Sequence, residues 1–312
     1  MLDCVVVGGG PAGLTAAIYL ARFHLDVRVI DAGNSRAATI PMTRNHAGFP
    51  DGIAGADLLD RMRAQARRYG ADLVSAAVAG LKQASDGLHV SAGDEVIATR
   101  SVLLATGVVN RRPPMSDDLH AAALARGLVR YCPICDGYEV TDRRVAVLGT
   151  GGHGTREAIF LRSYTADVTL IAPDGQHDLS PDERALLSKS EIAVVDGPAD
   201  GFAIDGDQIR LRTAQRDWGF DSLYPALGSD INSELAIGLG AARSDEGCLL
   251  VDPHQRTNIA RLYAAGDVVK GLDQISHAMG EGGVAATTIR NDLASEQALL
   301  RSAPQPFLAT LT

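Results

Sequence analysis

Cys132 and Cys135, two cysteines three residues apart, have the most direct chemical implication in this chain, with Pro133 between them and Asp136 directly after. At the first turn of a helix two such sulfurs lie close enough to form a disulfide, and the unpaired N–H groups and helix dipole stabilise a thiolate. Thiols in such settings reach pKa values of about 3.5–7.5 and attack disulfides at neutral pH. We therefore predict a redox pair, with Asp136 as its acid or base once its pKa is raised.

Structural explanations of the cysteine pair fit the sequence less well. A zinc site needs about four ligands, and the chain has no second C-x-x-C motif. We therefore expect no metal site. A structural disulfide across so short a loop would restrict the unfolded chain little. Cys4, in an expected strand over residues 2–7, and Cys248, in the apolar run 248–251, are interpreted as buried small hydrophobic residues.

A glycine loop at residues 8–13 predicts a nucleotide-binding unit. It has the pattern G-x-G-x-x-G and follows the apolar run 4–7, which is typical of a buried parallel strand. A helical pattern over 14–23 comes next, then a strand ending in Asp31, near the expected spacing of about 20 residues after the loop. The glycines let a pyrophosphate approach the helix N-terminus, and Asp31 is suited to bind ribose hydroxyls.

The same unit occurs a second time, 141 residues later, without a gap. The glycines of the second loop are Gly149, Gly151 and Gly154, followed by an expected helix over 155–164 and a strand over 167–171. Asp31 corresponds to Ala172, so the second copy has no carboxylate for a ribose. From there to Asp182 it also has no basic residue for a 2′-phosphate. Nucleotide binding and simple helix–strand packing both remain open for this loop.

The remaining patterns place the other elements and a linker. Residues 110–114 contain two adjacent prolines and are interpreted as a linker. Helices are expected over 55–69 and 276–300, with a helix stop at 303–306. Apolar runs predict strands over residues 71–76, 80–82, 88–91, 95–99, 101–107, 193–195, 208–211, 222–227 and 262–267, and the chain is expected to return to the first domain at 249–251.

Composition and charge limit the partners and the location. The net charge of −9 argues against nucleic acid or an anionic membrane as the main partner. No apolar run approaches the 18 or so residues of a membrane span. Four cysteines fit a reducing compartment, and residues 1–4 lack the basic start of a signal peptide. We expect a cytoplasmic protein.

Over nearly its whole length the chain resembles the low-molecular-weight thioredoxin reductases. The matching motifs are the glycine loop with Asp31, Asn45 with residues 48–52, Ala105-Thr106-Gly107, Cys132-Pro133-Ile134-Cys135-Asp136-Gly137, and Ala264-Ala265-Gly266-Asp267. The resemblance implies an α/β fold with two Rossmann-like, three-layer dinucleotide-binding domains, the second inserted in the first. The implied limits are 1–113 and 248–312 for the FAD-binding domain and 114–247 for the inserted one.

The resemblance also assigns roles to residues. Cys135 would be the sulfur next to the flavin, Cys132 the sulfur that attacks the partner, and Asp136 the acid/base. A homodimer, a swinging second domain and a thioredoxin-like protein or small dithiol or disulfide as partner are implied as well. The residues expected to bind FAD are Gly8, Gly10, Pro11, Ala12, Gly13, Asp31, Arg36, Asn45, Thr106, Gly107, Gly266, Asp267, Gln274 and Ile275.

Several positions depart from the family pattern. Arg36 stands where the family usually has Gln, and Asp273-Gln274-Ile275 replaces Arg-Gln-Ala. Ala172-Pro173-Asp174 replaces the His-Arg-Arg that binds the NADP 2′-phosphate. The chain therefore looks closer to relatives that take electrons from reduced ferredoxin or another donor. We predict an FAD-dependent thiol/disulfide oxidoreductase. The alternatives are an O₂-dependent dithiol oxidase, an NADPH-dependent thioredoxin reductase and a non-catalytic redox-sensing flavoprotein.

Other chemically capable side chains receive simpler interpretations. His46, His153 and His277 are interpreted as surface residues near the cofactor segments, with a proton relay as the alternative for His277. Trp218 is expected in a core. The basic residues of the helix over 55–69 are expected to form one solvated face; they are Arg61, Arg63, Arg67 and Arg68.

Overall fold

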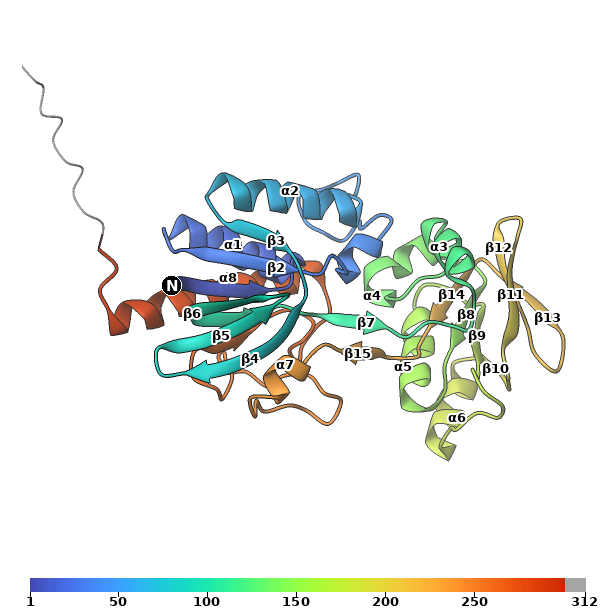
Figure 1. Ribbon diagram of the computed structural model, residues 1–312. Coiled ribbons are helices and arrows are strands. Elements are labelled where there is room, and N and C mark those ends of the chain that lie inside the picture. Colours follow the sequence, from blue (N-terminus) through green and yellow to red (C-terminus); the bar gives the residue numbers. More distant parts are fainter. Residues whose placement is uncertain (301–312) are drawn as a thin grey trace, which may run out of the picture.

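The computed structural model describes residues 1–300, so the expected helix stop at 303–306 lies outside the described part. The chain forms two α/β lobes side by side, joined by a narrow pair of strands (Figure 1). The first lobe contains both the N-terminal segment and the final helix. The second lobe is built from the middle of the chain.

A seven-stranded sheet forms the centre of the first lobe, in the order β3-β2-β1-β6-β5-β4 with β16 also paired to β6. The buried run at the end of β1 lies between two parallel neighbours, β2 and β6, as its continuous apolar pattern predicts. α1 (Pro11–Arg22) packs against α8 (Ile275–Glu296) on one face of the sheet. The strands are β1 (Leu2–Val7), β2 (Val27–Asp31), β3 (Asp72–Ser75), β4 (Val78–Ala84), β5 (Gly87–Ala92), β6 (Glu95–Leu104) and β16 (Leu262–Ala264).

One strand prediction in this lobe is wrong. The runs expected as two strands, 95–99 and 101–107, form the single strand β6, which ends at Leu104, because β1 pairs with it on both sides of Arg100. Leu249 makes isolated bridges to Arg243 and Val269 where the chain returns to this lobe. Cys248 is half-buried rather than buried, whereas Cys4 is fully buried in β1.

The second lobe has a four-stranded parallel sheet in the order β10-β9-β8-β14. Hydrophobic clusters cover both faces of this sheet, one of them shared with the antiparallel strands β11 to β13, so the lobe has three layers. Its strands are β8 (Val145–Leu148), β9 (Val168–Ile171), β10 (Ala193–Val195), β11 (Asp200–Asp205), β12 (Gln208–Arg212), β13 (Asp217–Phe220) and β14 (Ser222–Pro225). Its longer helices are α3 (Asp117–Ala125), α5 (Gly151–Leu161) and α6 (Pro181–Lys189).

Two antiparallel strands connect the lobes. The chain leaves the first lobe through β7 (Val108–Asn110) and returns through β15 (Ser229–Ile231), which pairs with β7. The short helix α7 (Glu234–Ile237) then packs against β4 of the first sheet. This path confirms the predicted class, two Rossmann-like domains with the second inserted in the first. The exact limits at 113/114 and 247/248 stay predictions.

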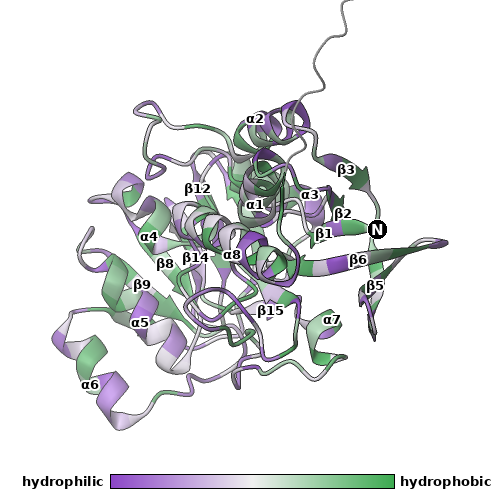
Figure 2. Cartoon of the chain, turned by 90° about the vertical axis from the view of Figure 1, so that its left-hand side faces the viewer, coloured by the Kyte–Doolittle hydropathy of each residue, from purple (hydrophilic) through white to green (hydrophobic). Residues whose placement is uncertain are grey.

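The helices differ little from their expected bounds. α2 (Gly55–Arg68) matches its prediction closely, and α5 begins earlier than expected because residues 151–154 form its first turn. Figure 2 shows hydrophobic residues concentrated along strands such as β9, with hydrophilic residues on surface helices such as α6. Within residues 1–300, no helix is both long and apolar enough to cross a bilayer.

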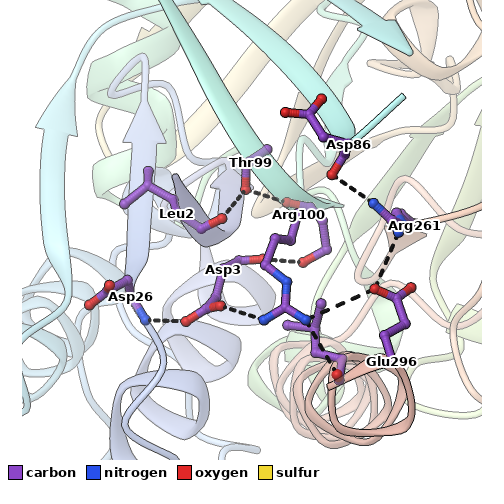
Figure 3. A network of polar contacts seen from close by, with 10 residues as sticks. Leu2, Asp3, Asp26, Asp86, Thr99, Arg100, Arg261 and Glu296 are labelled. Atoms are coloured by element: carbon purple, nitrogen blue, oxygen red, sulfur yellow. Dashed lines mark hydrogen bonds and ion pairs between the residues drawn. The ribbon is translucent and has the colours of Figure 1, made fainter. Parts of the chain in front are cut away.

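A polar network ties the N-terminal strand to the end of α8 (Figure 3). The Arg100 guanidinium donates to Asp3 Oδ1 at 3.0 Å and to the Leu293 carbonyl at 3.3 Å. Asp3 also accepts from the Asp26 backbone N–H, and Glu296 accepts from Arg261. The Arg100 side chain is only 16% exposed, so solvent cannot fully replace these partners.

We predict that Arg100→Ala lowers the free energy of unfolding by about 2 kcal/mol, because it leaves a half-buried carboxylate without its charged hydrogen-bond donor. Urea unfolding followed by circular dichroism measures this change. Arg212→Ala is the control, since its ion pair with Asp200 is largely exposed. That variant should change stability by no more than about 0.5 kcal/mol. Equal losses in the two variants would show that the network contributes nothing specific.

Candidate active site

The first glycine loop forms a tight cradle at the start of α1. Gly8 has φ +109°, and a Cβ there would collide with the Ala105 carbonyl. A Cβ at Gly13 would likewise collide with the Gly8 carbonyl. Gly10 caps α1 without a side-chain hydrogen bond, so the first N–H groups of the helix remain available to a ligand. This geometry fits the pyrophosphate of a dinucleotide.

The cradle opens into a cavity of about 790 Å³ that extends to the second lobe. This volume lies within the range of small-molecule and cofactor sites, about 300–1,000 Å³. Gly13 is the one predicted site residue absent from the lining, because it packs beneath the loop. The predicted residues that line the cavity are Gly8, Gly10, Pro11, Ala12, Asp31, Arg36, Asn45, Thr106, Gly107, Cys132, Cys135, Asp136, Gly266, Asp267, Gln274 and Ile275.

The cysteine pair lies at the far end of this cavity. Cys132 and Cys135 form a disulfide with Cα atoms 5.2 Å apart, and Cys132 caps the short helix α4 (Pro133–Asp136). Gln274, at the N-terminus of α8, places its side-chain Nε2 3.2 Å from each sulfur. Asn45 donates to the Gln274 amide oxygen at 3.0 Å and thereby orients that amide. The two lobes therefore meet at the disulfide.

Two departures from the family pattern form one ion pair. Arg36, in the short helix η1 (Arg36–Thr39), lies 2.9 Å from Asp273 and 3.7 Å from Asp267. Burial raises the pKa of Asp267 to about 6, while the Arg36 charge opposes that shift. The guanidinium thus stabilises two carboxylates beside the cavity.

Asp136 is held by two residues that sequence reasoning did not identify. Arg130 donates to Asp136 Oδ2 at 3.0 Å, and the Tyr224 hydroxyl donates to Oδ1 at 3.0 Å. Burial raises the pKa of Asp136, and Arg130 counteracts part of this rise. Arg130 is near Asp136 in sequence, but Tyr224 comes from β14, and no spacing pattern links it to the motif.

A second cavity, of about 320 Å³, also adjoins the disulfide. Cys132 lines both cavities, whereas Cys135 lines only the larger one. Helix α5 contributes one wall of the smaller cavity, including Glu157. Sequence reasoning did not single out Glu157, because a lone glutamate in a surface helix carries no signal of its own.

The second glycine loop is closed by the chain's own groups. A Cβ at Gly154 would collide with the backbone of Gly149, as close helix–strand packing requires. Thr150 Oγ1 accepts from the Asp178 backbone N–H at 2.9 Å and contacts His177 Nδ1 at 3.2 Å. Arg184 donates to the His177 carbonyl at 3.3 Å rather than projecting over the loop.

Two simpler interpretations can be compared with the structure here. Trp218 is buried against Phe220, as expected. The prediction of one solvated basic face on α2 is partly wrong, because Arg63 is half-buried and lies 3.6 Å from Asp31, the expected ribose acceptor.

The three histidines each have a polar neighbour. His46 contacts Ser276 Oγ at 3.0 Å, His153 contacts Glu157, and His277 contacts Glu281 at 3.0 Å. The relay role considered for His277 stays untested.

Comparison with known proteins identifies the family. Residues 2–282 match the model of the pyridine nucleotide-disulphide oxidoreductases. A thioredoxin reductase of Streptomyces clavuligerus is 34% identical over 286 residues, covering 86% of each chain. One of Listeria monocytogenes is 30% identical over 298 residues, covering 91% of each chain.

Structural comparison agrees with the sequence matches. The crystal structure of thioredoxin reductase from Streptococcus pyogenes superposes with a TM-score of 0.87 at 25% identity, covering 95% of this chain and 99% of that one. The chain belongs to the pyridine nucleotide-disulphide oxidoreductase family and is a thioredoxin reductase-like, FAD-dependent disulfide oxidoreductase.

Proposed function

We propose that the chain passes electrons between FAD in the larger cavity and a disulfide partner through Cys132–Cys135. One observation carries this proposal: a single cavity joins the pyrophosphate cradle to the disulfide, with the Gln274 amide touching both sulfurs. A structural disulfide would have no need of such a connection. The similarity to thioredoxin reductases favours a thioredoxin-like protein as one partner. A homodimer is proposed on the same basis.

Bound FAD supplies a two-electron carrier beside the disulfide. The cradle at residues 8–13 and the N-terminus of α1 would hold its pyrophosphate, and Asp31 its ribose. Asp267 and Gln274, together with Thr106 and Asn45, would orient the remainder, since all four line the same cavity. Arg36, paired with Asp267 and Asp273, would balance negative charge near the carrier.

The two sulfurs would have different roles in electron transfer. Cys135 borders only the FAD-side cavity, which supports its assignment as the sulfur that receives electrons. Cys132 also borders the second cavity, which supports its role in exchange with the partner. Asp136 would take or return the proton of the Cys135 thiol, because Arg130 and Tyr224 fix its carboxylate in the larger cavity.

The electron donor is proposed to be something other than a nicotinamide nucleotide. The second glycine loop lacks a ribose acceptor, since Ala172 is buried where Asp31 stands in the first copy. Asp174 places a negative charge just beyond the strand, where a 2′-phosphate needs cations. Reduced ferredoxin, or a dithiol, would deliver electrons instead.

We predict that the protein purifies yellow with one FAD per chain and that Gly13→Val loses the flavin. The valine side chain would displace the loop that binds the pyrophosphate. The ratio of flavin to protein absorbance measures occupancy. Gly152→Ala is the control in the second loop, because its Cβ would meet only the movable ends of Arg156 and Glu183. A colourless wild-type protein, or full occupancy in Gly13→Val, would contradict the assignment.

We predict that Cys132→Ser shows a long-wavelength charge-transfer band and that Cys135→Ser shows none. In the first variant, Cys135 remains as a lone thiolate on the flavin side. The visible spectrum of each purified variant reports the band. If the band appears in Cys135→Ser instead, the roles of the two sulfurs are exchanged.

We predict slow anaerobic flavin reduction by NADPH and NADH and fast reduction by reduced ferredoxin. Each missing charge-assisted hydrogen bond to the 2′-phosphate is worth about 1.5–3 kcal/mol, so two cost about two to four orders of magnitude in affinity. Stopped-flow bleaching of the flavin measures the rates. Pro173→Arg combined with Asp174→Arg should accelerate reduction by NADPH. Rapid bleaching of the wild type by micromolar NADPH would refute the proposal.

A further inference from the structure

Two cavities of different size adjoin the cysteine pair. The larger cavity is lined by Cys132, Cys135 and Asp136, and the smaller one by Cys132 and Glu157. Cys132 is thus the sulfur that borders both cavities, and Glu157 shares the smaller one with it. Asp136 does not line the smaller cavity, and Glu157 does not line the larger one.

Glu157 is placed as a proton donor rather than as a partner in an ion pair. Its Oε2 is shielded from solvent and has no hydrogen-bond partner, and its Oε1 lies 3.3 Å from His153 Nε2. Burial raises the pKa of Glu157 to about 7, with the Arg156 charge opposing the rise. Burial and Arg156 both lower the pKa of His153, which therefore tends to be neutral.

Other charged groups at this cavity are engaged with one another. Arg36 and Asp273 also line it, but they form the ion pair described above. Among residues 1–300, the charge of Arg156 and the imidazole of His153 therefore act on Glu157. Two carboxyl groups with different surroundings, each lining a cavity that Cys132 borders, are the arrangement expected of separate acid and base assignments.

The walls of the smaller cavity suit a small, partly apolar molecule. Ile134, Phe160 and Leu272 line it and are 50%, 41% and 48% exposed. A cavity of about 320 Å³ lies at the lower end of the range for small-ligand sites, about 300–1,000 Å³. A folded protein partner is far too large to enter it and could reach Cys132 only if the lobes moved.

We propose that the second cavity binds a low-molecular-weight, uncharged disulfide and that the Glu157–His153 pair handles the proton of its exchange with Cys132. This inference rests on the proposed function, because the flavin-dependent activity must first reduce Cys132–Cys135. It adds a substrate class and a second acid/base group to that function.

The exchange balances as follows in atoms and electrons. The Glu157 carboxylate takes the Cys132 thiol proton, the thiolate attacks one substrate sulfur, and the substrate S–S bond breaks. The departing thiolate receives that proton from Glu157. Cys135, after losing its proton to Asp136, then attacks Cys132 Sγ. The protein disulfide re-forms, and the second substrate thiol leaves with a proton from solvent. The substrate is reduced by two electrons and the cysteine pair is oxidised by two.

The test uses the full-chain holoprotein with Cys135→Ser, so that Cys132 forms a stable mixed disulfide without electrons from the flavin. Two uncharged probes differ in their need for an acid. Bis(2-hydroxyethyl) disulfide releases a basic alkyl thiolate, whereas 2,2′-dithiodipyridine releases a group that is stable without protonation. Intact mass and peptide mapping, which separate Cys132 from Cys4 and Cys248, give the rate of adduct formation.

Adding Glu157→Gln should slow adduct formation with the alkyl disulfide by about 10- to 100-fold, since general acid catalysis commonly contributes about 10²-fold or more. Adduct formation with the pyridyl disulfide should slow by less than about twofold, because its leaving group needs no acid. A raised carboxyl pKa means that the acid is present below about pH 7 and is lost above it. The rate of reaction with the alkyl disulfide, expressed per Cys132 thiolate, should therefore fall as the pH rises through about 7. This fall should be absent in Glu157→Gln.

Glu139→Gln is the matched control. Glu139 also has a buried, unpartnered Oε2, but it does not line the second cavity. Its substitution should leave the ratio of the two probe rates unchanged. Equal slowing of both probes by Glu157→Gln, or no slowing, would overturn the proposal. So would reaction of Cys132 with an oxidised thioredoxin but with neither small probe. Flavin-driven opening of the disulfide in the wild type is measured separately, so failure of the exchange site and failure of the proposed function are distinguishable.

Discussion

The contact between the Gln274 amide and both sulfurs of the cysteine pair is the constraint on which the arrangement of the lobes depends. Gln274 belongs to the first lobe and the disulfide to the second, so this contact brings the cysteines to the end of the cofactor cavity. Asn45 reinforces it by donating to the same amide. Without this meeting point, the pyrophosphate cradle and the redox pair would be two unrelated sites on one chain.

Two charged residues near the contact between the lobes differ from the family pattern. Arg36 and Asp273 each depart from the family pattern, and each would leave an unbalanced charge if it stood alone. In the structure they form an ion pair at 2.9 Å, with Asp267 also close to the guanidinium. The two departures are therefore one coupled change.

The two glycine loops belong to copies of one supersecondary unit but have different surroundings. In both copies the third glycine lets a helix pack closely on the loop backbone. The first copy adjoins a large cavity lined by its own loop and by Asp31. In the second copy, the Thr150 hydroxyl contacts the His177 ring and accepts from the Asp178 backbone N–H, and Arg184 donates to the His177 carbonyl. This difference supports packing as the main role of the second loop.

The sequence by itself determined the local elements, the repeated unit and the redox motif. These depend on short-range rules: apolar runs for buried strands, glycines where a backbone must approach closely, and two cysteines within one helical turn. Only the tertiary structure decided which side chains surround that motif. Arg130 lies in the loop between α3 and α4, Tyr224 in β14 and Glu157 in α5. The fold, rather than any spacing in the chain, sets their burial and their partners, and therefore the pKa values that govern proton transfer.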